Sequence, residues 1–380
     1  MKKVLLFANT EWYLFNFRLG FAKFLRERGF EVVMVSPQGP YGSRLEAEGF
    51  RWIPLDMDRR SLNPWRELKL IVRISVLLRE EAPVLLHNFT IKCVVYGSLA
   101  SRLVGVGARL NAVAGMGYIF SGRGLQVRLL KPIVKSLLKL ALSGKSARLV
   151  VQNQDDLFSF VHAGLVPKNS IRLIKGSGVN TNRFRPPERC REVRPTRVLL
   201  AARLLWDKGV GEYVEAARKL KEEGLDIEFW LAGDIDLGNP ASVSASDVES
   251  WRKAGVVLPL GHVEDMAKLL AEIDIMVLPS SYREGVPRSL IEAASCGLPI
   301  ITTEAPGCRE IVEDGVNGYL VPVRDANGLA NAIRRLHADP ALRHAMGKTG
   351  REVVLKEFDE QIVFDKTLAV YHELLSEMAK

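Results

Sequence analysis

Two carboxylates, Glu284 and Glu292, flank a Gly-Val-Pro turn at 285–287. Because Pro287 suits the first position of a helix, we predict a helix over 288–296. A strand, a tight turn and a helix N-terminus together make an anion site, since the first helical N–H groups are unpaired and the helix dipole favours negative charge. Phosphate fits such a site, and the two carboxylates can hold hydroxyl groups of the same ligand. The alternative is two solvated glutamates around an ordinary helix.

Two cations follow an earlier predicted strand at 198–201. Arg203 and Lys208 lie between this strand and the next helix, where open α/β sheets bind ligands, and together they can neutralise a diphosphate. By themselves these two residues would be better explained as solvated side chains of a loop. Gly233 and the pair His262-Val263 follow later strands of the same half, so several strand-end turns are predicted to line one cleft.

Metal ligation is not predicted. The strings Asp56-Met-Asp58 and Asp234-Ile-Asp236 could in principle hold Mg²⁺, but hard cations need more converging oxygen ligands. The four cysteines show neither close paired spacing nor an accompanying His cluster, which indicates reduced thiols in a cytosol.

The elements that must position these residues follow an α/β pattern. A chain of 380 residues exceeds one ordinary core, and apolar runs alternate with amphipathic helical segments throughout. We predict two Rossmann-like domains with parallel sheets facing across a cleft. The predicted strands are 4–7, 31–35, 52–55, 84–86, 110–113, 149–151 and 171–174, then 198–201, 227–231, 256–260, 275–278, 299–302 and 319–321.

The predicted domains are residues 1–186 and 197–357. A Pro- and Arg-rich stretch at 187–196 is interpreted as the linker, because it lacks any apolar period. The final helical segment, 358–380, could pack on either half, and periodicity does not choose between them.

The two halves of the chain differ in net charge. Residues 1–200 hold 33 Lys and Arg against 14 Asp and Glu, whereas residues 201–380 hold 20 against 30. No acidic residue occurs between Glu81 and Asp155. Such a basic half attracts a polyanion, an anionic lipid surface or a phosphate-bearing substrate.

The segment 125–142 is predicted to be a basic amphipathic helix that Pro132 must open or kink. At 100° per residue its cations fall within an arc of about 80°, opposite the apolar residues and with Leu138 at the border. These cations are Arg128, Lys131, Lys135 and Lys139. The helix either covers the N-terminal sheet with a solvated basic edge or lies on anionic lipids, and both are compatible.

Neither a signal peptide nor a spanning segment is predicted. The apolar run after Met1 is too short for a signal-peptide core, and no run of 18 apolar residues exists. We therefore expect a cytoplasmic protein, peripheral on the inner face of the cytoplasmic membrane.

The ordered motifs resemble a family-4 retaining glycosyltransferase of the GT-B fold, over about residues 1–351. The motifs that carry the resemblance are Gly178 to Pro186, Arg203 with Lys208-Gly209, Leu231-Ala-Gly-Asp234, Gly261-His-Val263, Glu284-Gly-Val-Pro287 with Glu292, and Asp314 with Gly318. Asn88-Phe-Thr-Ile-Lys92 and Pro306-Gly-Cys-Arg-Glu310 are most similar to bacterial enzymes that extend undecaprenyl-diphosphate-linked sugars. Examples are the N-acetylgalactosaminyltransferases that act on a bacillosamine-bearing lipid.

The resemblance implies a role for each matching residue. Arg203 and Lys208 would hold the diphosphate of a UDP-sugar, Glu284 the hydroxyls of the transferred sugar, and Glu292 the ribose. Other donor-binding residues would be Gly285, Val286, Pro287, Ser289, Leu290, Gly233, His262 and Val263. Cations and amides would then stabilise the charge that develops on the leaving diphosphate without a metal or other cofactor.

Acceptor-side candidates lie in the first half: Asn16, Arg18, His87 and Tyr118. His87 lies at a predicted strand end, where a lone His is more often a structural residue than a ligand-binding one. Many relatives carry a His in the loop that here reads Gly115-Met-Gly117, so no His-based acceptor contact is expected there. Asn180 likewise stands where relatives have Asp.

The predicted reaction transfers a sugar, an N-acetylhexosamine, from a UDP-sugar to a polyprenyl-diphosphate-linked saccharide. A nucleotide-sugar epimerase, or a transferase with a soluble acceptor, is the alternative within this fold. A dehydrogenase would need a full Gly-x-Gly-x-x-Gly, whereas Gly115-Met-Gly117 and Gly176-Ser-Gly178 both lack the third glycine. A nucleic-acid-binding protein would explain the basic half but not the acidic one, so no nucleic acid is expected.

Overall fold

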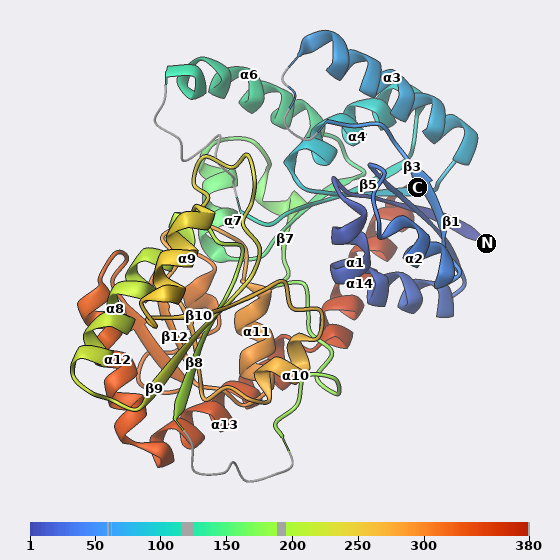
Figure 1. Cartoon of the computed structure of the whole chain (residues 1–380). Coiled ribbons are helices and arrows are strands. Elements are labelled where there is room, and N and C mark those ends of the chain that lie inside the picture. The colour runs from blue at the N-terminus through green and yellow to red at the C-terminus, as the bar shows by residue number, and fades with distance from the viewer. Residues whose placement is uncertain (59–60, 62, 116–124, 188–194, 379–380) are drawn as a thin grey trace. The chain divides into compact units, whose positions relative to one another are not determined.

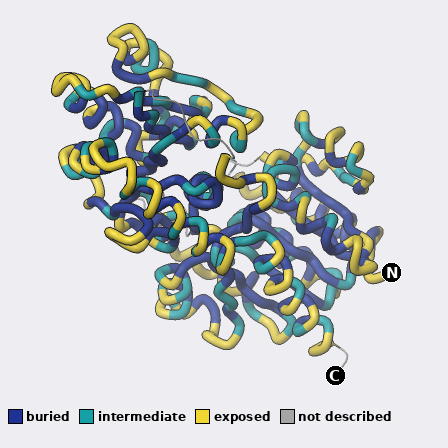
Figure 2. The backbone as a smooth tube through the Cα atoms, turned by 90° about the horizontal axis from the view of Figure 1, so that it is seen from below, coloured by how far each residue is buried: buried dark blue, intermediate teal, exposed yellow. Residues whose placement is uncertain are grey.

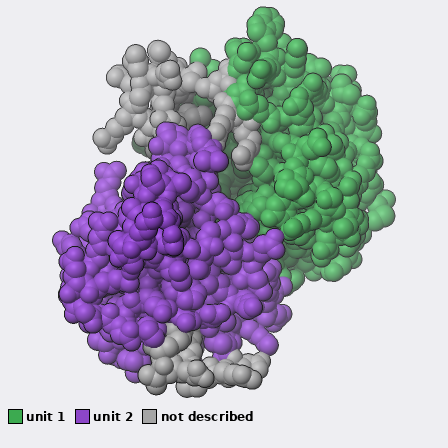
Figure 3. Space-filling model, viewed as in Figure 1, with its two compact units in different colours: residues 1–174, 360–380 green, residues 175–359 purple. Residues whose placement is uncertain are grey.

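The computed structural model describes residues 1–58, 61, 63–115, 125–187 and 195–378, with the backbone alone for 125–131. These residues form two compact units, residues 1–174 with 360–380 and residues 175–359 (Figure 3). Each unit holds a fully parallel sheet with helices on both faces (Figure 1). The α/β class and the two parallel sheets predicted from the sequence are confirmed.

The sheet of the first unit has the strand order β3-β2-β1-β4-β5-β6-β7. Its direction of growth reverses between β1 and β4, so the sheet has a topological switch point there. The strands are β1 (Lys2–Phe7), β2 (Phe30–Ser36), β3 (Arg51–Pro54), β4 (Leu85–Phe89), β5 (Ala108–Val113), β6 (Ala147–Val151) and β7 (Ile171–Leu173). The helices are α1 (Glu11–Glu27), α2 (Gly42–Ala47), α3 (Pro64–Glu81), α4 (Ile91–Val104), α6 (Leu125–Leu142), α7 (Gln154–His162) and α14 (Glu360–Met378), with a 3₁₀ turn η1 (Lys168–Ser170).

Alternation along β1 shows how this sheet is covered on both faces. Val4 and Leu6 pack with apolar residues of α1 and α14, whereas Leu5 and Phe7 pack with residues of α3 and α4. Successive side chains of a strand point to opposite faces, so one apolar strand contributes to two helical layers. Most strand residues of this sheet are buried, although the edge strand β3 is partly exposed, and most exposed residues lie on outer helices and loops (Figure 2).

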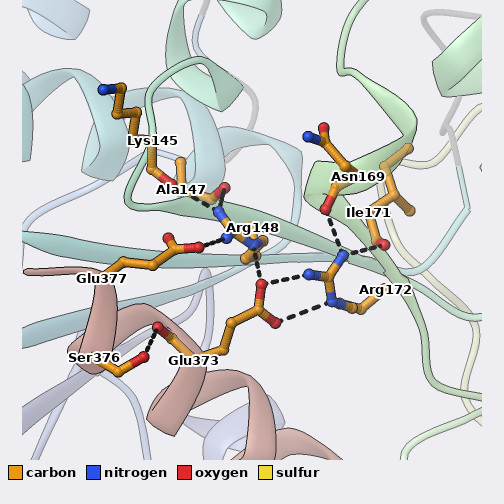
Figure 4. A network of polar contacts seen from close by, with 9 residues as sticks. All are labelled: Lys145, Ala147, Arg148, Asn169, Ile171, Arg172, Glu373, Ser376 and Glu377. Carbon is orange, nitrogen blue, oxygen red and sulfur yellow. Dashed lines mark hydrogen bonds and ion pairs between the residues drawn. The ribbon is translucent and has the colours of Figure 1, made fainter.

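Helix α14 belongs to the first unit, although it follows the second unit in the chain. Arg148 on β6 donates from Nε to Oε1 of Glu373 at 2.7 Å and also pairs with Glu377 (Figure 4). Arg172 on β7 donates from Nε to Oε2 of Glu373 at 3.1 Å. Two arginines of adjacent strands therefore hold one carboxylate of α14.

The sheet of the second unit has the order β10-β9-β8-β11-β12-β13 and reverses between β8 and β11. Its strands are β8 (Thr196–Ala201), β9 (Ile227–Ala232), β10 (Leu258–Gly261), β11 (Ile275–Leu278), β12 (Ile300–Thr303) and β13 (Gly318–Val321). Its helices are α8 (Val210–Glu222), α9 (Ala245–Lys253), α10 (Met266–Leu270), α11 (Arg288–Ser295), α12 (Ala326–Ala338) and α13 (Pro340–Glu357), with 3₁₀ turns η2 (Trp206–Lys208) and η3 (Cys308–Glu310).

The boundary between the units lies at 174/175 rather than at 186, where the sequence pattern placed it. Val179 and Phe184 are buried in one apolar cluster with Leu290 and Ile291 of α11, so the segment that contains them packs on the second unit. Because these two apolar side chains are buried in the second unit, the boundary lies N-terminal to the Pro- and Arg-rich stretch. Residues 188–194 of the predicted linker lie outside the described residues.

Candidate functional site

The predicted donor-binding residues collect at the switch point of the second sheet. Arg203 and Lys208 follow β8, and Glu284 follows β11, the neighbouring strand on the other side of the reversal. The carboxyl ends of parallel strands share one edge of a sheet, and loops diverge there at a switch point. The structure thus brings together residues that lie far apart in sequence.

Lys208 and Glu284 form an ion pair at this edge. The Nζ atom of Lys208 donates to Oε2 of Glu284, and the two side chains are 12% and 17% exposed. The hydroxyl of Ser280 donates to the other carboxylate oxygen, Oε1, at 3.1 Å. A carboxylate held by an ammonium group and a hydroxyl is fixed in position before any ligand arrives.

A glycine allows the turn that carries Lys208 to approach β11. Gly209 has φ of 78°, and a Cβ atom there would lie 2.2 Å from the carbonyl oxygen of Pro279. Any side chain would therefore push η2 away from the residues after β11. The glycine of the Lys208-Gly209 pair thus has a packing role beside the charge role of the lysine.

The loop after β12 supports the turn that carries Glu284. The sequence analysis did not predict this contact. Gly307 has φ of 91°, and a Cβ atom there would lie 2.1 Å from the carbonyl oxygen of Gly285. The amide of Glu284 donates to the carbonyl of Pro306 at 3.4 Å. The Pro-Gly dipeptide after a strand marks a turn, but nothing local shows which segment the turn contacts.

Helix α11 begins at Arg288, as predicted, with Pro287 as its N-cap residue. Val286 and Leu290 are buried in the core, so their side chains are not available to a ligand, and the amide of Leu290 donates to the carbonyl of Pro287 at 3.1 Å. Ser289 is partly exposed in the first helical turn. The N-terminus of this helix has the dipole and amide direction that favour a phosphate.

Glu292 lies on α11 and is 9% exposed. Arg288 donates from Nε to its Oε1 atom at 2.8 Å, one helical turn earlier. Burial raises the pKa of Glu292, although the charge and hydrogen bond of Arg288 and the charge of Arg183 oppose that rise. The structure therefore shows a carboxylate that already has one cationic partner, and its predicted ribose contact stays a prediction.

Arg203 extends toward the loop after β9. Its side chain is 63% exposed and donates to Oδ2 of Asp236 at 2.8 Å. Burial and the charge of Glu284 raise the pKa of Tyr282, whereas the charge of Arg203 lowers it. Arg203 and Glu284 therefore act on a common neighbour at this edge of the sheet.

The turns after β8, β9 and β10 also meet. Gly233 has φ of 139°, a Cβ atom there would lie 1.9 Å from the carbonyl of Ala202, and its amide donates to the carbonyl of Gly261 at 2.8 Å. His262 contacts Oδ2 of Asp234 through Nδ1 at 2.9 Å, and both side chains are exposed. Val263, another predicted donor-binding residue, packs against the apolar cluster of β8 and β11.

Both Asp-x-Asp strings have cationic or hydrogen-bonding partners. Asp234 contacts His262 and Asp236 accepts from Arg203, as described above, while Asp56 pairs with Arg73 at 2.7 Å. No group of three or more metal-ligating side chains occurs among the described residues. Metal independence stays a prediction for experiment.

The predicted acceptor-side residues lie near the switch point of the first sheet. Arg18 on α1 is 8% exposed, its guanidinium lies 4.3 Å from the ring centroid of Phe89, and it donates to the hydroxyl of Tyr13 at 2.6 Å. No carboxylate pairs with Arg18 in the described part of the chain, and its Nε has no partner there. Asn16, two residues earlier on α1, is partly exposed and donates to the carbonyl of Trp12 at 3.0 Å.

His87 lies in the core rather than at the surface. It is 2% exposed, and its Nδ1 lies 2.8 Å from the hydroxyl of Tyr371 on α14. Burial, and then the charge of Arg18, lower the pKa of His87 well below its usual value, so the ring is neutral. Tyr118, the remaining acceptor-side candidate, lies outside the described residues.

Helix α6 packs with a different face from the one predicted. Leu138, placed at the border of the apolar arc, is fully buried, whereas Ile133 and Leu140 are 57% and 46% exposed. The buried face differs because α6 packs against α4, and that contact covers only part of the predicted apolar arc. Lys135 and Lys139 are exposed, while the side chains of Arg128 and Lys131 lie outside the described ones. The helix continues through Pro132.

Comparison with known proteins identifies both halves. The model described as glycosyl transferases group 1 matches residues 195–339, and a glycosyl transferase 4-like model matches residues 3–153. N,N'-diacetylbacillosaminyl-diphospho-undecaprenol alpha-1,3-N-acetylgalactosaminyltransferase of Campylobacter jejuni is 30% identical, over 95% of this chain and 96% of its own. UDP-Gal:alpha-D-GlcNAc-diphosphoundecaprenol alpha-1,3-galactosyltransferase of Escherichia coli is 26% identical, over 83% of this chain and 82% of its own.

Solved structures share the fold at lower identity. A glycosyltransferase from Rickettsia africae has a TM-score of 0.80 at 19% identity, with 98% of both chains covered. The Anabaena protein HepE in complex with UDP has a TM-score of 0.77 at 19% identity, covering 98% of this chain and all of its own.

Proposed function

This chain belongs to the glycosyl transferase group 1 family and is a glycosyltransferase of the GT-B fold, and from that premise we propose its reaction. The proposed enzyme moves an N-acetylhexosamine from a UDP-sugar to a polyprenyl-diphosphate-linked saccharide, with retention at the anomeric carbon, during bacterial surface-glycan assembly. Support for the acceptor comes from the names of the two relatives, each of which acts on an undecaprenyl-diphosphate-linked sugar.

The Lys208–Glu284 ion pair is the observation that carries the donor side of the proposal. Phosphate oxygens are strong acceptors for an ammonium group, so an arriving diphosphate competes with Glu284 for Lys208. The displaced carboxylate then accepts hydrogen bonds from hydroxyls of the transferred sugar. One exchange of partners thus opens the site to both parts of the donor.

Charge stabilisation drives the proposed chemistry. The bond between the anomeric carbon and the diphosphate oxygen breaks, and a bond to the acceptor oxygen forms on the same face of the sugar. Lys208, Arg203 and the amides at the start of α11 stabilise the negative charge on the leaving diphosphate. The proton of the acceptor hydroxyl passes to the departing phosphate oxygen, so no separate protein base is required.

Arg18 supplies the acceptor side of the proposal. A buried guanidinium without a carboxylate is costly unless a ligand or another acceptor compensates it. Arg18 therefore suits an anionic acceptor, whereas a contact of Asn16 with the acceptor stays a prediction, because residues two apart on a helix do not face each other. We assign His87 a structural role, because it contacts α14 in the core and does not reach the surface.

We also propose that the protein works at the inner face of the cytoplasmic membrane. The exposed Lys135 and Lys139 of α6 support an electrostatic contact with anionic lipids. Among the described residues, no helix is both long and apolar enough to cross a bilayer. A peripheral contact is therefore the form of membrane binding that we propose.

The test measures UDP release by the purified protein. A panel of UDP-sugars is offered with undecaprenyl-diphosphate saccharides, with soluble saccharides and without acceptor, and NMR assigns the anomeric configuration of the product. We expect release that depends on the lipid-linked acceptor, a product with the anomeric configuration of the donor, and no release by Glu284→Ala. Transfer to soluble saccharides alone, or conversion of one UDP-sugar into another without an acceptor, would support the alternatives within this fold.

A further inference from the structure

Helix α3 has a second apolar face that points away from the core. Its inner face contributes buried residues to the cluster with β1 and β2. Its outer face carries four exposed apolar residues, which are Trp65, Leu68, Val72 and Val76, at 75%, 53%, 55% and 45% exposure. At 100° per residue these four fall within an arc of about 80°, directly opposite the buried face.

This outer face is unusual for a helix that covers a sheet. A surface helix normally has polar residues opposite its core face, whereas a helix that is apolar on both faces is normally covered on both. Single exposed apolar residues are common, but a contiguous stripe marks an interaction surface. Trp65 adds an amphipathic ring of the kind that lies at membrane–water interfaces.

The charges around the stripe are mainly positive. Helices α3, α4 and α6 lie side by side on one face of the first sheet (Figure 1). Their sequences contain ten Lys and Arg against three Glu. Glu67 is buried and pairs with Lys92, and Glu81 is buried and pairs with Lys3, which leaves Glu80 as the exposed carboxylate of these helices.

Three positive residues of α3 lie on one side of the stripe, and the exposed Arg79 is in line with it near the end of the helix. Lys69 is exposed beside the stripe, while Arg73 pairs with Asp56 at 2.7 Å and Arg66 lies 3.8 Å from Asp58. On α6, the apolar Ile133 and Leu140 and the cations Lys135 and Lys139 are also exposed. The same helical layer therefore combines exposed apolar side chains with basic ones on two of its helices.

We infer that the outer face of α3 docks on an anionic lipid bilayer, with Trp65, Leu68 and Val72 in the interface and the flanking cations at the headgroups. This inference rests on the proposed function, in which the acceptor carries a polyprenyl chain. Moving an apolar stripe out of water lowers the free energy, and attraction between basic residues and anionic headgroups lowers it further. A second copy of this chain fits less well, because two basic layers would face each other.

The test compares binding to vesicles. The full chain is floated with phosphatidylglycerol-rich vesicles and with phosphatidylcholine vesicles, at low and at physiological salt. The main variant combines Trp65→Gln, Leu68→Gln and Val72→Gln, since glutamine retains helix propensity and these side chains are exposed. The matched control is Leu355→Gln, which removes an exposed apolar residue of α13 in the second unit.

We expect the triple variant to bind anionic vesicles at least about tenfold more weakly than the unchanged protein, a loss of about 1.4 kcal/mol, while Leu355→Gln binds normally. Brominated lipids should quench fluorescence of the unchanged protein more than that of Trp65→Phe. Normal vesicle binding by the triple variant would overturn the inference. It would equally be overturned if the unchanged protein were a dimer that the triple substitution converts to a monomer, because a second copy would then cover the face.

Activity separates this inference from the proposed function. The triple variant should retain transfer to a short-chain, water-soluble polyprenyl-diphosphate acceptor and lose transfer to a full-length acceptor in vesicles. If no polyprenyl-diphosphate acceptor is used by either protein, the proposed function fails, whereas the vesicle measurement still reports on α3. Equal activity of both proteins on the vesicle-bound acceptor would count against a working role of the surface.

Discussion

Replacing Glu284 with glutamine should separate UDP binding from sugar transfer. Without ligand, the Nζ atom of Lys208 contacts Oε2 of Glu284, and both side chains are less than one-fifth exposed. A diphosphate that binds Lys208 must displace this carboxylate. The carboxylate therefore competes with UDP, although the proposed reaction needs it for the transferred sugar.

The expected changes in UDP affinity and transfer rate follow from the contact between Lys208 and Glu284. A hydrogen bond to a charged group contributes about 1.5–3 kcal/mol net, and about 1.4 kcal/mol corresponds to a tenfold change in Kd. Lys208→Ala should therefore weaken UDP binding about 10- to 150-fold. Glu284→Gln keeps the lysine and removes its charged competitor, so UDP should bind equally well or more tightly while the transfer rate falls by at least about 100-fold.

Isothermal titration calorimetry with UDP and a steady-state transfer assay measure the two effects separately. Glu249→Gln is the control, because it removes one negative charge from an exposed site on α9 that pairs with Arg252. If Glu284→Gln weakened UDP binding as much as Lys208→Ala does, the carboxylate would support the diphosphate site instead of competing for it. That result would refute the proposed exchange of partners.

Three further predictions concern the metal, a backbone contact and pH. Excess EDTA should leave the transfer rate unchanged, and an inhibition that Mg²⁺ or Mn²⁺ reverses would contradict a metal-independent site. Gly307→Ala should lower the Tm and weaken UDP binding, since its Cβ would lie 2.1 Å from the carbonyl of Gly285 at φ of 91°; native values of both would contradict the proposed support of the turn. Burial alone would raise the pKa of Glu373, but Arg148 and Arg172 outweigh it and hold that pKa below its usual value. A carboxylate whose pKa is lowered in the folded state stabilises the fold at pH values above its unfolded pKa of about 4.3, and this stabilisation is lost as pH falls through the folded pKa. Urea unfolding should therefore show that Glu373→Gln is less stable than the unchanged protein at neutral pH. The difference in unfolding free energy between the two proteins should shrink below about pH 4. A margin independent of pH would show that the ion pair is not its source.

Local patterns were sufficient for most of the fold. Each predicted strand overlaps a strand of the structure, because short apolar runs between amphipathic helical segments indicate the strands of an α/β sheet. The start of α11 was also predictable, since Pro287 and the following apolar period act within a few residues. The types of residue in the candidate donor site were likewise read from motifs at strand ends.

Tertiary packing determined the position of the last helix and the buried face of α6, which the local sequence pattern did not. Periodicity did not show whether the last helix covers one half or the other, and the contact of Tyr371 with His87 in the first unit is visible only in the fold. The apolar arc of α6 was correctly recognised, yet contact with α4 determined that Leu138 lies inside and Ile133 outside. An apolar arc limits the faces that a helix can bury but does not select one of them.

The sequence by itself determined the two α/β halves, their charge and the order of the strand-end motifs, because these depend on neighbouring residues. Only the tertiary structure decided that β8 lies beside β11, which brings Lys208 to Glu284 across 76 positions of sequence. It also decided that Gly307 supports the turn at Gly285 and that the outer stripe of α3 is exposed in the described part of the chain. These features depend on which strands and helices become neighbours, and that choice minimises the free energy of the whole chain rather than of any single segment.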